Sequence, residues 1–161
     1  MHFSYKNIDV AYSAIKNQII QTPLISSDYI NKQLDSKIFF KLENLQNTGS
    51  FKFRGASYKI SKLTDENKKN GVVAYSSGNH AQAVAYASLQ QNISCKIIMP
   101  NNAPKVKLNA VKNYKAKITL CEPTLEARRT TLDDIAEKTG ATVIHPFNNP
   151  NVIAGQGTAA L

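Results

Sequence analysis

The sequence has few of the residues on which disulfide-bonded, metal-bound or membrane proteins depend. It holds two cysteines, Cys95 and Cys121, and each lies in an apolar run without a second cysteine or a histidine at metal-ligand spacing. Tryptophan is absent, no apolar run approaches the roughly 18 residues that span a membrane, and the N-terminus lacks the apolar stretch of a secretory signal. We therefore expect reduced core cysteines, no metal site, no membrane association and a cytoplasmic protein.

Acidic residues are also scarce, with 11 Asp and Glu against 20 Lys and Arg, which gives a formal charge of +9. Such a balance can attract nucleic acid, membrane surfaces or small anions. The lysines are scattered in ones and twos, however, and the sequence has no basic helix and no stripe of alternating basic and aromatic residues. The charge therefore indicates a solvated surface, and we expect no nucleic-acid partner.

The regular alternation of apolar runs and helical segments in the second half predicts the fold class. At 161 residues the chain can bury one domain-sized core or a little more. Apolar runs occur at 71–75, 95–99, 116–121 and 142–144, and helical segments near 79–90, 104–113 and 125–139. This alternation is typical of parallel βαβ units. It predicts an α/β fold with an open, four-stranded parallel sheet covered by helices on both faces.

Weaker patterns occur outside that region. Five apolar residues at helical spacing predict an opening helix that Thr22-Pro23 ends: Ile8, Ala11, Tyr12, Ile15 and Ile19. Residues 24–36 contain a short helix and residues 37–41 a strand, while Ser50 is expected to cap the next helix. Helix ends are predicted at four further residues, with Pro104 and Pro150 at first positions, Thr124 as an N-cap and Gly140 after a helix. The helix begun by Pro150 is expected to run to Leu161.

The segment Ser76-Ser77-Gly78-Asn79-His80 follows a predicted strand and precedes an alanine-rich helix. In an open α/β sheet, ligands bind at the carboxyl ends of strands, where the next helix offers free N–H groups and a positive dipole end. Gly78 lets a ligand approach the backbone closely, and the hydroxyls and the amide supply directional hydrogen bonds. The loop is a candidate anion site, although an ordinary capped βα loop fits the pattern equally well.

A second candidate is Lys52, which lies between Phe51 and Phe53 close to a predicted helix start. A lysine amine removed from water in this way is a candidate for condensation with an aldehyde. Most lysines are solvated surface residues, and the two phenylalanines fit a structural core as well. The pattern around Lys52 alone therefore does not decide between the two interpretations.

Taken together, the two segments resemble a known family. Residues 41–56, KLENLQNTGSFKFRGA, resemble the lysine signature of the serine/threonine dehydratases and the related serine racemases, which are fold-type II pyridoxal-phosphate (PLP) enzymes. Three further stretches agree in order, namely Ser76 to Gln82, Met99 to Lys107 and His145 to Thr158. The resemblance covers essentially all 161 residues, and its first motif is highly specific.

The resemblance implies a role for individual residues. Lys52 corresponds to the lysine that binds PLP as a Schiff base and then removes the Cα proton of the substrate. Phe51 corresponds to the residue beside the pyridine ring, and Asn79 to the amide that hydrogen-bonds the ring's phenolic oxygen. Arg54 is expected to be an ion-pair partner rather than a catalyst. The substrate carboxylate would bind the loop of Ser76, Ser77, Gly78, Asn79 and His80, with His80 acting through its backbone or as a structural residue.

The implied reaction is the β-elimination of an L-hydroxy amino acid, threonine or serine, to a 2-oxo acid and ammonia, by a homo-oligomer. Ser77 keeps an alternative open, because the Ser-Ser-Gly-Asn-His form also resembles serine racemases and hydroxyaspartate dehydratases. In the racemases that serine protonates the opposite face of the carbanion. A serine at this position is also an ordinary loop cap, so Ser77 is a candidate catalytic residue only for racemisation.

The resemblance also divides the chain into parts. Residues 1–70 correspond to the N-terminal part of the large PLP domain, 71–145 to the small α/β domain, and 146–161 to the start of the return into the large domain. Family members continue to a run of glycines that holds the PLP phosphate, and the seven glycines of this chain form no such run. A hypothesis from another class therefore stays open, in which the chain is a non-catalytic α/β module that binds anions.

Overall fold

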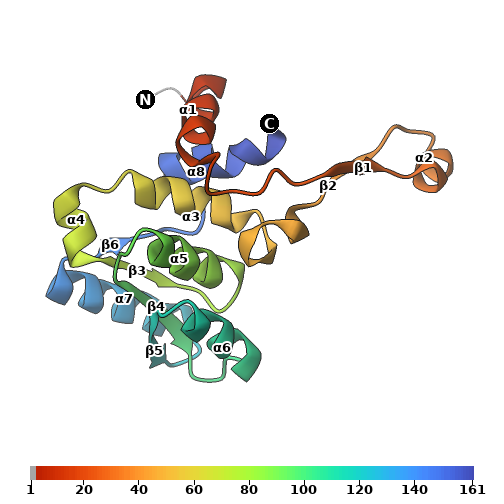
Figure 1. Ribbon diagram of the computed structural model, residues 1–161. Coiled ribbons are helices and arrows are strands. Elements are labelled where there is room, and N and C mark those ends of the chain that lie inside the picture. Colours follow the sequence, from red (N-terminus) through yellow and green to blue (C-terminus); the bar gives the residue numbers. More distant parts are fainter. Residues whose placement is uncertain (1–2) are drawn as a thin grey trace.

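A computed structural model describes residues 3–161 and contains the predicted parallel sheet (Figure 1). Its four strands are β3 (Val72–Tyr75), β4 (Cys95–Pro100), β5 (Lys117–Cys121) and β6 (Thr142–Val143). They lie in the order β5-β4-β3-β6, and all neighbouring pairs are parallel. The α/β class and the four-stranded parallel sheet expected from the sequence are therefore confirmed.

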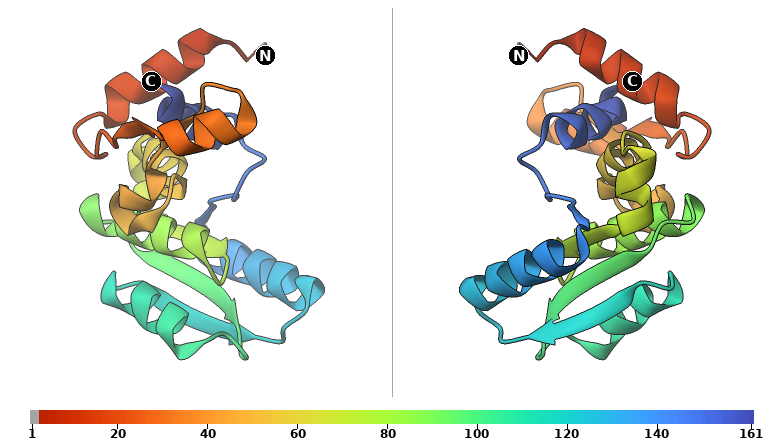
Figure 2. Two further views of the ribbon diagram at one scale, coloured as in Figure 1. Left: turned by 90° about the vertical axis from the view of Figure 1, so that its right-hand side faces the viewer. Right: turned by 90° about the vertical axis from the view of Figure 1, so that its left-hand side faces the viewer.

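Helices cover both faces of this sheet because successive strand residues point to opposite sides. Val72, Ala74 and Ile97 pack in the core cluster that also contains residues of α5 (Asn79–Gln90) and α6 (Lys105–Asn113). Val73 and Ile98 belong to a separate cluster with Leu132 of α7 (Leu125–Thr139). Figure 2 shows α7 on one side of the sheet and α5 and α6 on the other.

Helix-end residues account for most of these boundaries. The Thr124 hydroxyl accepts a hydrogen bond from the Ala127 amide at 3.0 Å, so Thr124 is the N-cap of α7, and Gly140 ends that helix in the left-handed conformation with φ of +66°. Pro150 is the first residue of α8 (Pro150–Gly157), as expected. Pro104 is the N-cap of α6 rather than its first residue, so that boundary was wrong by one position.

A second group of helices packs against α5. It consists of α1 (Tyr5–Ile15), α3 (Lys52–Ser61) and α8, whose contact cluster includes Ala11, Tyr58 and Ala154. Helix α3 packs against α8 on one side and α5 on the other. A Cβ atom on Gly155 would lie 2.7 Å from the Arg54 carbonyl oxygen, so only glycine permits this close crossing of α3 and α8.

An arm projects from this body in Figure 1. It consists of β1 (Leu24–Ser26), α2 (Asp28–Leu34) and β2 (Phe39–Lys41), and the two strands pair antiparallel. Short 3₁₀ turns at Glu43–Leu45 and Asn47–Gly49 connect the arm to α3. The arm carries exposed apolar side chains, such as Leu24 and Phe39, which are 60% and 61% exposed. The short helix and the second strand were predicted, whereas β1 was not.

Three predicted features differ in the structure. Ser50 does not cap α3, because Phe51 is the N-cap residue and the buried Ser50 hydroxyl has no hydrogen-bond partner among the described residues. The opening helix ends at Ile15, well before Thr22-Pro23. The last helix ends at Gly157 and continues only as a 3₁₀ turn, Thr158–Ala160. A further helix, α4 (Asp65–Asn70), was not predicted.

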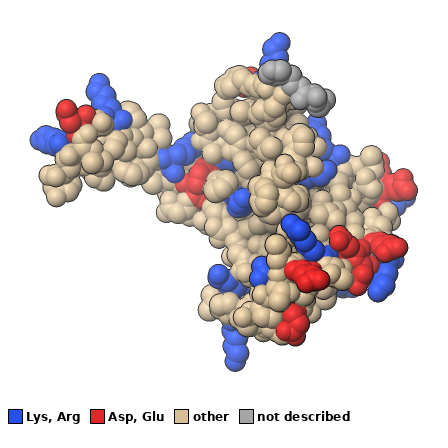
Figure 3. Space-filling model, turned by 180° about the vertical axis from the view of Figure 1, so that it is seen from behind, with Lys and Arg blue, Asp and Glu red and all other residues tan. Residues whose placement is uncertain are grey.

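The charged side chains on one face of the molecule are distributed as expected for a solvated surface. Figure 3 shows Lys and Arg side chains interspersed with Asp and Glu on the face in view, without a continuous basic band. Among residues 3–161, no helix is long and apolar enough to cross a membrane. Both cysteines are free thiols; Cys95 is buried, but Cys121 is only half-buried rather than in the core. The division at residues 70 and 145 stays a prediction.

Candidate active site

Lys52 is the first residue of α3, and its side chain extends toward the segment that connects β6 to α8. The Lys52 ammonium donates a hydrogen bond of 2.9 Å to the carbonyl oxygen of Pro146. The same Nζ atom lies 5.1 Å from the centre of the Phe51 ring, which is 42% exposed. The half-buried lysine is therefore held in one orientation by a carbonyl and an aromatic ring.

The Ser76–His80 loop lies at the carboxyl end of β3, where α5 begins. The Gly78 amide donates to the Ser76 hydroxyl at 3.2 Å. Within residues 3–161, no side chain caps α5, and its first turn contains no acidic residue. A Cβ atom on Gly78 would meet nothing within 4 Å, so the space beside this helix start is open. A helix end with free amides, a positive dipole and open space can bind an anion.

The connecting segment 144–146 brings the lysine and the loop together. His80 Nε2 is hydrogen-bonded to the carbonyl oxygen of Ile144 at 2.9 Å, and Lys52 bonds the carbonyl of Pro146 two residues later. Lys52 is also close enough to His80 for its charge to lower the pKa of the imidazole. The structure thus brings together Lys52 and the Ser76–His80 loop, which lie 24 residues or more apart in the sequence.

His80 acts as a structural residue through its side chain. It is 4% exposed, and its Nδ1 atom has no hydrogen-bond partner in the described part of the chain. Burial lowers the pKa of His80 from 6.5 to about 4; the bond to Ile144 opposes this shift, and the charges of Lys52 and His145 add to it. His80 is therefore a neutral imidazole near pH 7, and it fixes the start of α5 to the end of β6. Ser77 is half-buried and Asn79 exposed on the same loop.

This buried imidazole predicts that the chain loses stability in mild acid. The pKa of His80 is lower in the folded chain than the 6.5 of the ordinary side chain, so the unfolded state binds more protons between about pH 6.5 and about pH 4. The free energy of unfolding should fall across this range by about 3 kcal/mol from His80 alone. Urea denaturation at several pH values measures it, and His80→Gln should remove this part of the slope. An equal slope in both proteins would contradict the assignment.

An ion pair between Arg54, in the first turn of α3, and Glu43 anchors the start of this helix. Arg54 Nη2 and Nε donate to the two carboxylate oxygens of Glu43 at 2.7 and 2.8 Å. Nη2 also donates to the carbonyl oxygen of Ile20 at 3.3 Å, and Nη1 donates to that of Thr158 at 3.4 Å. Burial would raise the pKa of Glu43, but hydrogen bonds from Arg54 and Thr22 and the charge of Arg54 hold it below its ordinary value. Arg54 is the ion-pair partner that the sequence predicted.

Residues that bond through their backbone were missed by the sequence analysis. The carbonyl groups of Ile144 and Pro146 organise the site, yet a carbonyl is common to every residue and leaves no sequence signal. Gln156 was also missed as a site residue, although its side chain bonds the backbone of α3. The only available signal was the inclusion of His145 to Thr158 in the motif that resembles the family.

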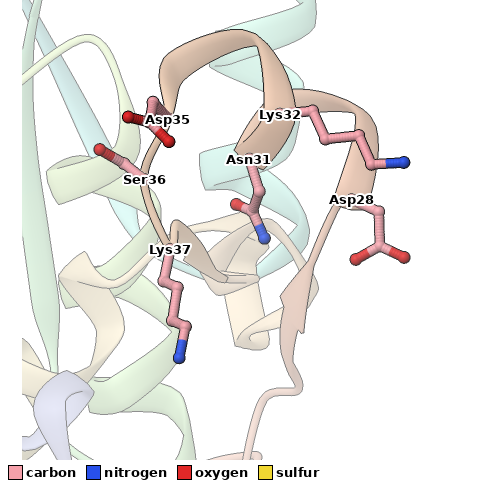
Figure 4. A pocket seen from close by; sticks show the side chains of 6 residues that line it. All are labelled: Asp28, Asn31, Lys32, Asp35, Ser36 and Lys37. Atoms are coloured by element: carbon pink, nitrogen blue, oxygen red, sulfur yellow. The ribbon is translucent and has the colours of Figure 1, made fainter.

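The hollow at the end of the arm offers no second candidate site. It is lined by side chains of α2 and of the turn that follows it, and these side chains point in different directions (Figure 4). Its Asn31 amide already bonds the Ser26 hydroxyl and the Ile38 amide at 2.9 Å each. Among residues 3–161, no group of three or more His, Cys, Asp or Glu side chains could hold a metal ion. The surroundings of Lys52 are thus the candidate site.

Comparison with known proteins finds relatives that match nearly the whole of this chain. The chain is 46% identical to the serine racemase of Dictyostelium discoideum over 97% of its own length and 48% of that protein. The crystal structure of that racemase superposes with a TM-score of 0.93 over 98% of this chain and 52% of the other, at 45% identity. A β-hydroxyaspartate dehydratase of Paracoccus denitrificans is 41% identical over 98% of this chain and 50% of its own length. A catabolic L-threonine dehydratase of Staphylococcus aureus is 45% identical over 98% and 46%.

The chain thus spans about half the length of the curated relatives that it matches. These relatives include a racemase and two dehydratases, so they agree on the family but not on one activity. The sequence profile described as "Pyridoxal-phosphate dependent enzyme" matches residues 15–161, which is nearly the whole chain. With the fold and the lysine described above, the chain belongs to the fold-type II family of pyridoxal-phosphate dependent enzymes.

Proposed function

We propose that this chain supplies the reactive lysine and the substrate-carboxylate site of an ammonia-lyase that eliminates water from an L-hydroxy amino acid, threonine or serine. The observation that carries the proposal is the placement of Lys52 beside the free first turn of α5, with both tied to the segment 144–146. An amine next to an anion-binding helix end is what the deprotonation of an amino acid at Cα requires.

The residues around Lys52 fit PLP in part. The Lys52 amine can condense with the aldehyde, the exposed Phe51 ring can pack beside the pyridine, and the exposed Asn79 amide can bond the phenolic oxygen. The dianionic phosphate needs a cradle of backbone N–H groups. The seven glycines are dispersed, so this chain has no such run: Gly49, Gly55, Gly71, Gly78, Gly140, Gly155 and Gly157. The family resemblance implies that the cradle lies in the part of a complete enzyme that this chain does not cover.

The chain's own groups have three tasks in the proposed reaction. The amides of the first turn of α5, with the Ser76 hydroxyl beside them, bind the substrate carboxylate. PLP, when bound, accepts the electron pair left at Cα. Lys52 Nζ removes the Cα proton and passes a proton to the departing β-hydroxyl, which leaves as water, and hydrolysis of the released enamine gives the 2-oxo acid and ammonia. Because His80 is neutral and tied to Ile144, it holds this loop in place without exchanging protons with the substrate.

A test joins residues 1–161 to the second half of a relative. Two chimeras are useful, one with the second half of the Staphylococcus aureus threonine dehydratase and one with that of the Dictyostelium discoideum serine racemase. We expect both to form a 2-oxo acid from L-threonine or L-serine at about 1 per second or more. If neither chimera binds PLP or forms a 2-oxo acid although both fold, the proposal is wrong.

Serine racemisation is the second candidate, and Ser77 favours it because this half-buried serine lies on the loop proposed to bind the substrate carboxylate. Racemisation needs a proton donor on the face opposite Lys52, whereas elimination does not. In either chimera, Ser77→Ala should therefore lower the formation of D-serine by about 10²-fold or more and leave 2-oxo acid formation within a few-fold. Equal loss of both activities would assign Ser77 to binding of the carboxylate instead.

The chain by itself should fold but should not turn over substrate. Residues 72–143 form a capped sheet covered on both faces, and Phe53, Ala56 and Ile60 of α3 complete its core, so the core closes within the described chain. Without the phosphate cradle, PLP at Lys52 would be poorly oriented. We expect a cooperative thermal transition of the 161-residue chain and no 2-oxo acid above background. Turnover near 1 per second would show that the cradle is dispensable.

Two further expectations belong to the proposal as family properties. The complete enzyme is proposed to act in the cytoplasm as a homo-oligomer, and residues 71–145 are proposed to form its small domain, with residues 1–70 and 146–161 in the large one. The exposed apolar side chains of the arm and of α1 and α8, such as Leu24, Val10 and Ile153, support a larger assembly of this kind.

A further inference from the structure

The first turn of α3 is held by a side chain from another helix. The first N–H groups of a helix have no partner within it and need one from outside. The amides of Phe53 and Arg54 donate to the carbonyls of Ser50 and Phe51 at 3.5 and 3.1 Å. The next amide, that of Gly55, donates instead to Oε1 of Gln156 in α8 at 3.1 Å. Gln156 therefore serves as a cap for the helix that carries Lys52.

The second group of the same amide acts on Lys52 directly. Gln156 Nε2 donates a long bond of 3.5 Å to the main-chain carbonyl oxygen of Lys52. At the other end of this residue, Lys52 Nζ donates to the Pro146 carbonyl at 2.9 Å. Pro146 and Gln156 both belong to the stretch that runs from β6 through α8. One stretch of the chain thus holds both ends of the lysine.

The close approach of Gln156 depends on a glycine. A Cβ atom on Gly55 would lie 2.5 Å from Gln156 Nε2 and 2.6 Å from its Cδ. Across the same helix crossing, a Cβ atom on Gly155 would lie 2.7 Å from the Gly55 Cα atom. Both positions require glycine, because any side chain would separate α3 from α8. The two glycines and the glutamine therefore form one contact, in which the amide of Gln156 lies against the Gly55 backbone.

We infer that Gln156 is a positioning residue for Lys52. Through its two hydrogen bonds it fixes the first turn of α3 and thereby the direction in which the lysine leaves the helix. The inference deepens the proposed function, since it concerns the placement of the same lysine. An amine placed wrongly by about 1 Å can lose about 10² in rate, so a cap at this turn matters more than one at an ordinary helix end.

The test compares two variants of the 161-residue chain. Gln156→Met keeps the length of the side chain and removes both hydrogen bonds. Val152→Ala is the matched control, because Val152 lies one turn earlier in α8, is 1% exposed and loses only packing. Thermal melting identifies a temperature at which both variants and the wild type are folded. All further measurements are made at that temperature.

The first readout needs no cofactor. In NMR spectra, Gln156→Met should raise the hydrogen exchange rate of the Gly55 amide by about tenfold and increase the mobility of the Lys52 side chain, while Val152→Ala should change neither by more than about twofold. If Gly55 and Lys52 are unchanged in Gln156→Met, the inference is overturned. It is also overturned if both variants change them equally, because Gln156 would then contribute only general packing.

The second readout uses PLP and borohydride reduction, followed by peptide mapping. The labelled share of Lys52 relative to Lys59, which lies on the same helix, should fall by about tenfold in Gln156→Met and stay unchanged in Val152→Ala. An unchanged ratio in Gln156→Met would count against the inference. Absence of label at Lys52 in the wild type would count against the proposed function alone, because the NMR measurement decides the role of Gln156 without PLP.

Discussion

Replacing Lys52 with alanine in the chimeras should lower 2-oxo acid formation by about 10³-fold or more. The reason is that Lys52 Nζ is the group proposed both to hold PLP and to remove the Cα proton. Its bond to Pro146 and the nearby Phe51 ring already orient it toward the segment that also anchors the start of α5. Steady-state kinetics with L-threonine and L-serine measure the loss. Borohydride reduction in the presence of PLP should label Lys52 of the parent chimera well above its other lysines, and Lys52→Ala should show only the background label of those lysines.

A matched control for this prediction lies on the same helix. Lys59 is two turns further along α3, half-buried, and away from the first turn. Lys59→Ala should therefore keep both the label at Lys52 and the rate within a few-fold. A melting temperature of Lys52→Ala within a few degrees of the parent shows that its loss of activity is chemical. Unchanged labelling of the Lys52→Ala chimera would falsify the assignment of the reactive lysine.

The sheet could be predicted from the sequence because its signals are local. Strands such as β4 are apolar on both sides, as expected for a parallel sheet that is buried on both faces. Residues such as Thr124 and Gly140 mark helix ends by their own chemistry. Prediction was poorer where a helix end is determined by contacts with other helices. Serine is a common N-cap residue, which is why Ser50 was expected to cap α3. The side chain that accepts a hydrogen bond from the first turn of α3 is instead that of Gln156, which is 106 residues away.

The site could be predicted only as far as side-chain chemistry appears in the sequence. Lys52 and Ser76 to His80 were singled out because amines, hydroxyls and amides are reactive or bind anions. The direction of the His80 ring could not be predicted, because it depends on the carbonyl of Ile144 at the end of a strand 64 residues later. The anchoring of Lys52 to Pro146 was missed for the same reason. A backbone carbonyl has no residue type, so only the folded chain shows where it points.

The second large effect concerns stability. Glu43→Leu should lower the free energy of unfolding of the 161-residue chain by about 3–5 kcal/mol, because it leaves the Arg54 guanidinium buried without its carboxylate. The Arg54 side chain is 2% exposed and that of Glu43 is 14% exposed, so little water can reach the guanidinium in place of the lost carboxylate. The carbonyls of Ile20 and Thr158 remain as acceptors, but they carry no charge to oppose that of the guanidinium. Urea denaturation at pH 7 measures the loss.

The double variant Glu43→Leu, Arg54→Met separates the loss of the charge pair from the loss of packing. It removes both charges and keeps apolar volume, so it should be more stable than Glu43→Leu alone. The pH dependence gives an independent check. Because the pKa of Glu43 is lower in the folded state than its ordinary 4.5, its contribution is present above about pH 4.5 and is lost as the pH falls through the folded-state value. Wild type should lose this contribution in acid, and the double variant should not. A double variant less stable than Glu43→Leu would mean that Arg54 stabilises the start of α3 mainly through Ile20 and Thr158, and that the ion pair is secondary.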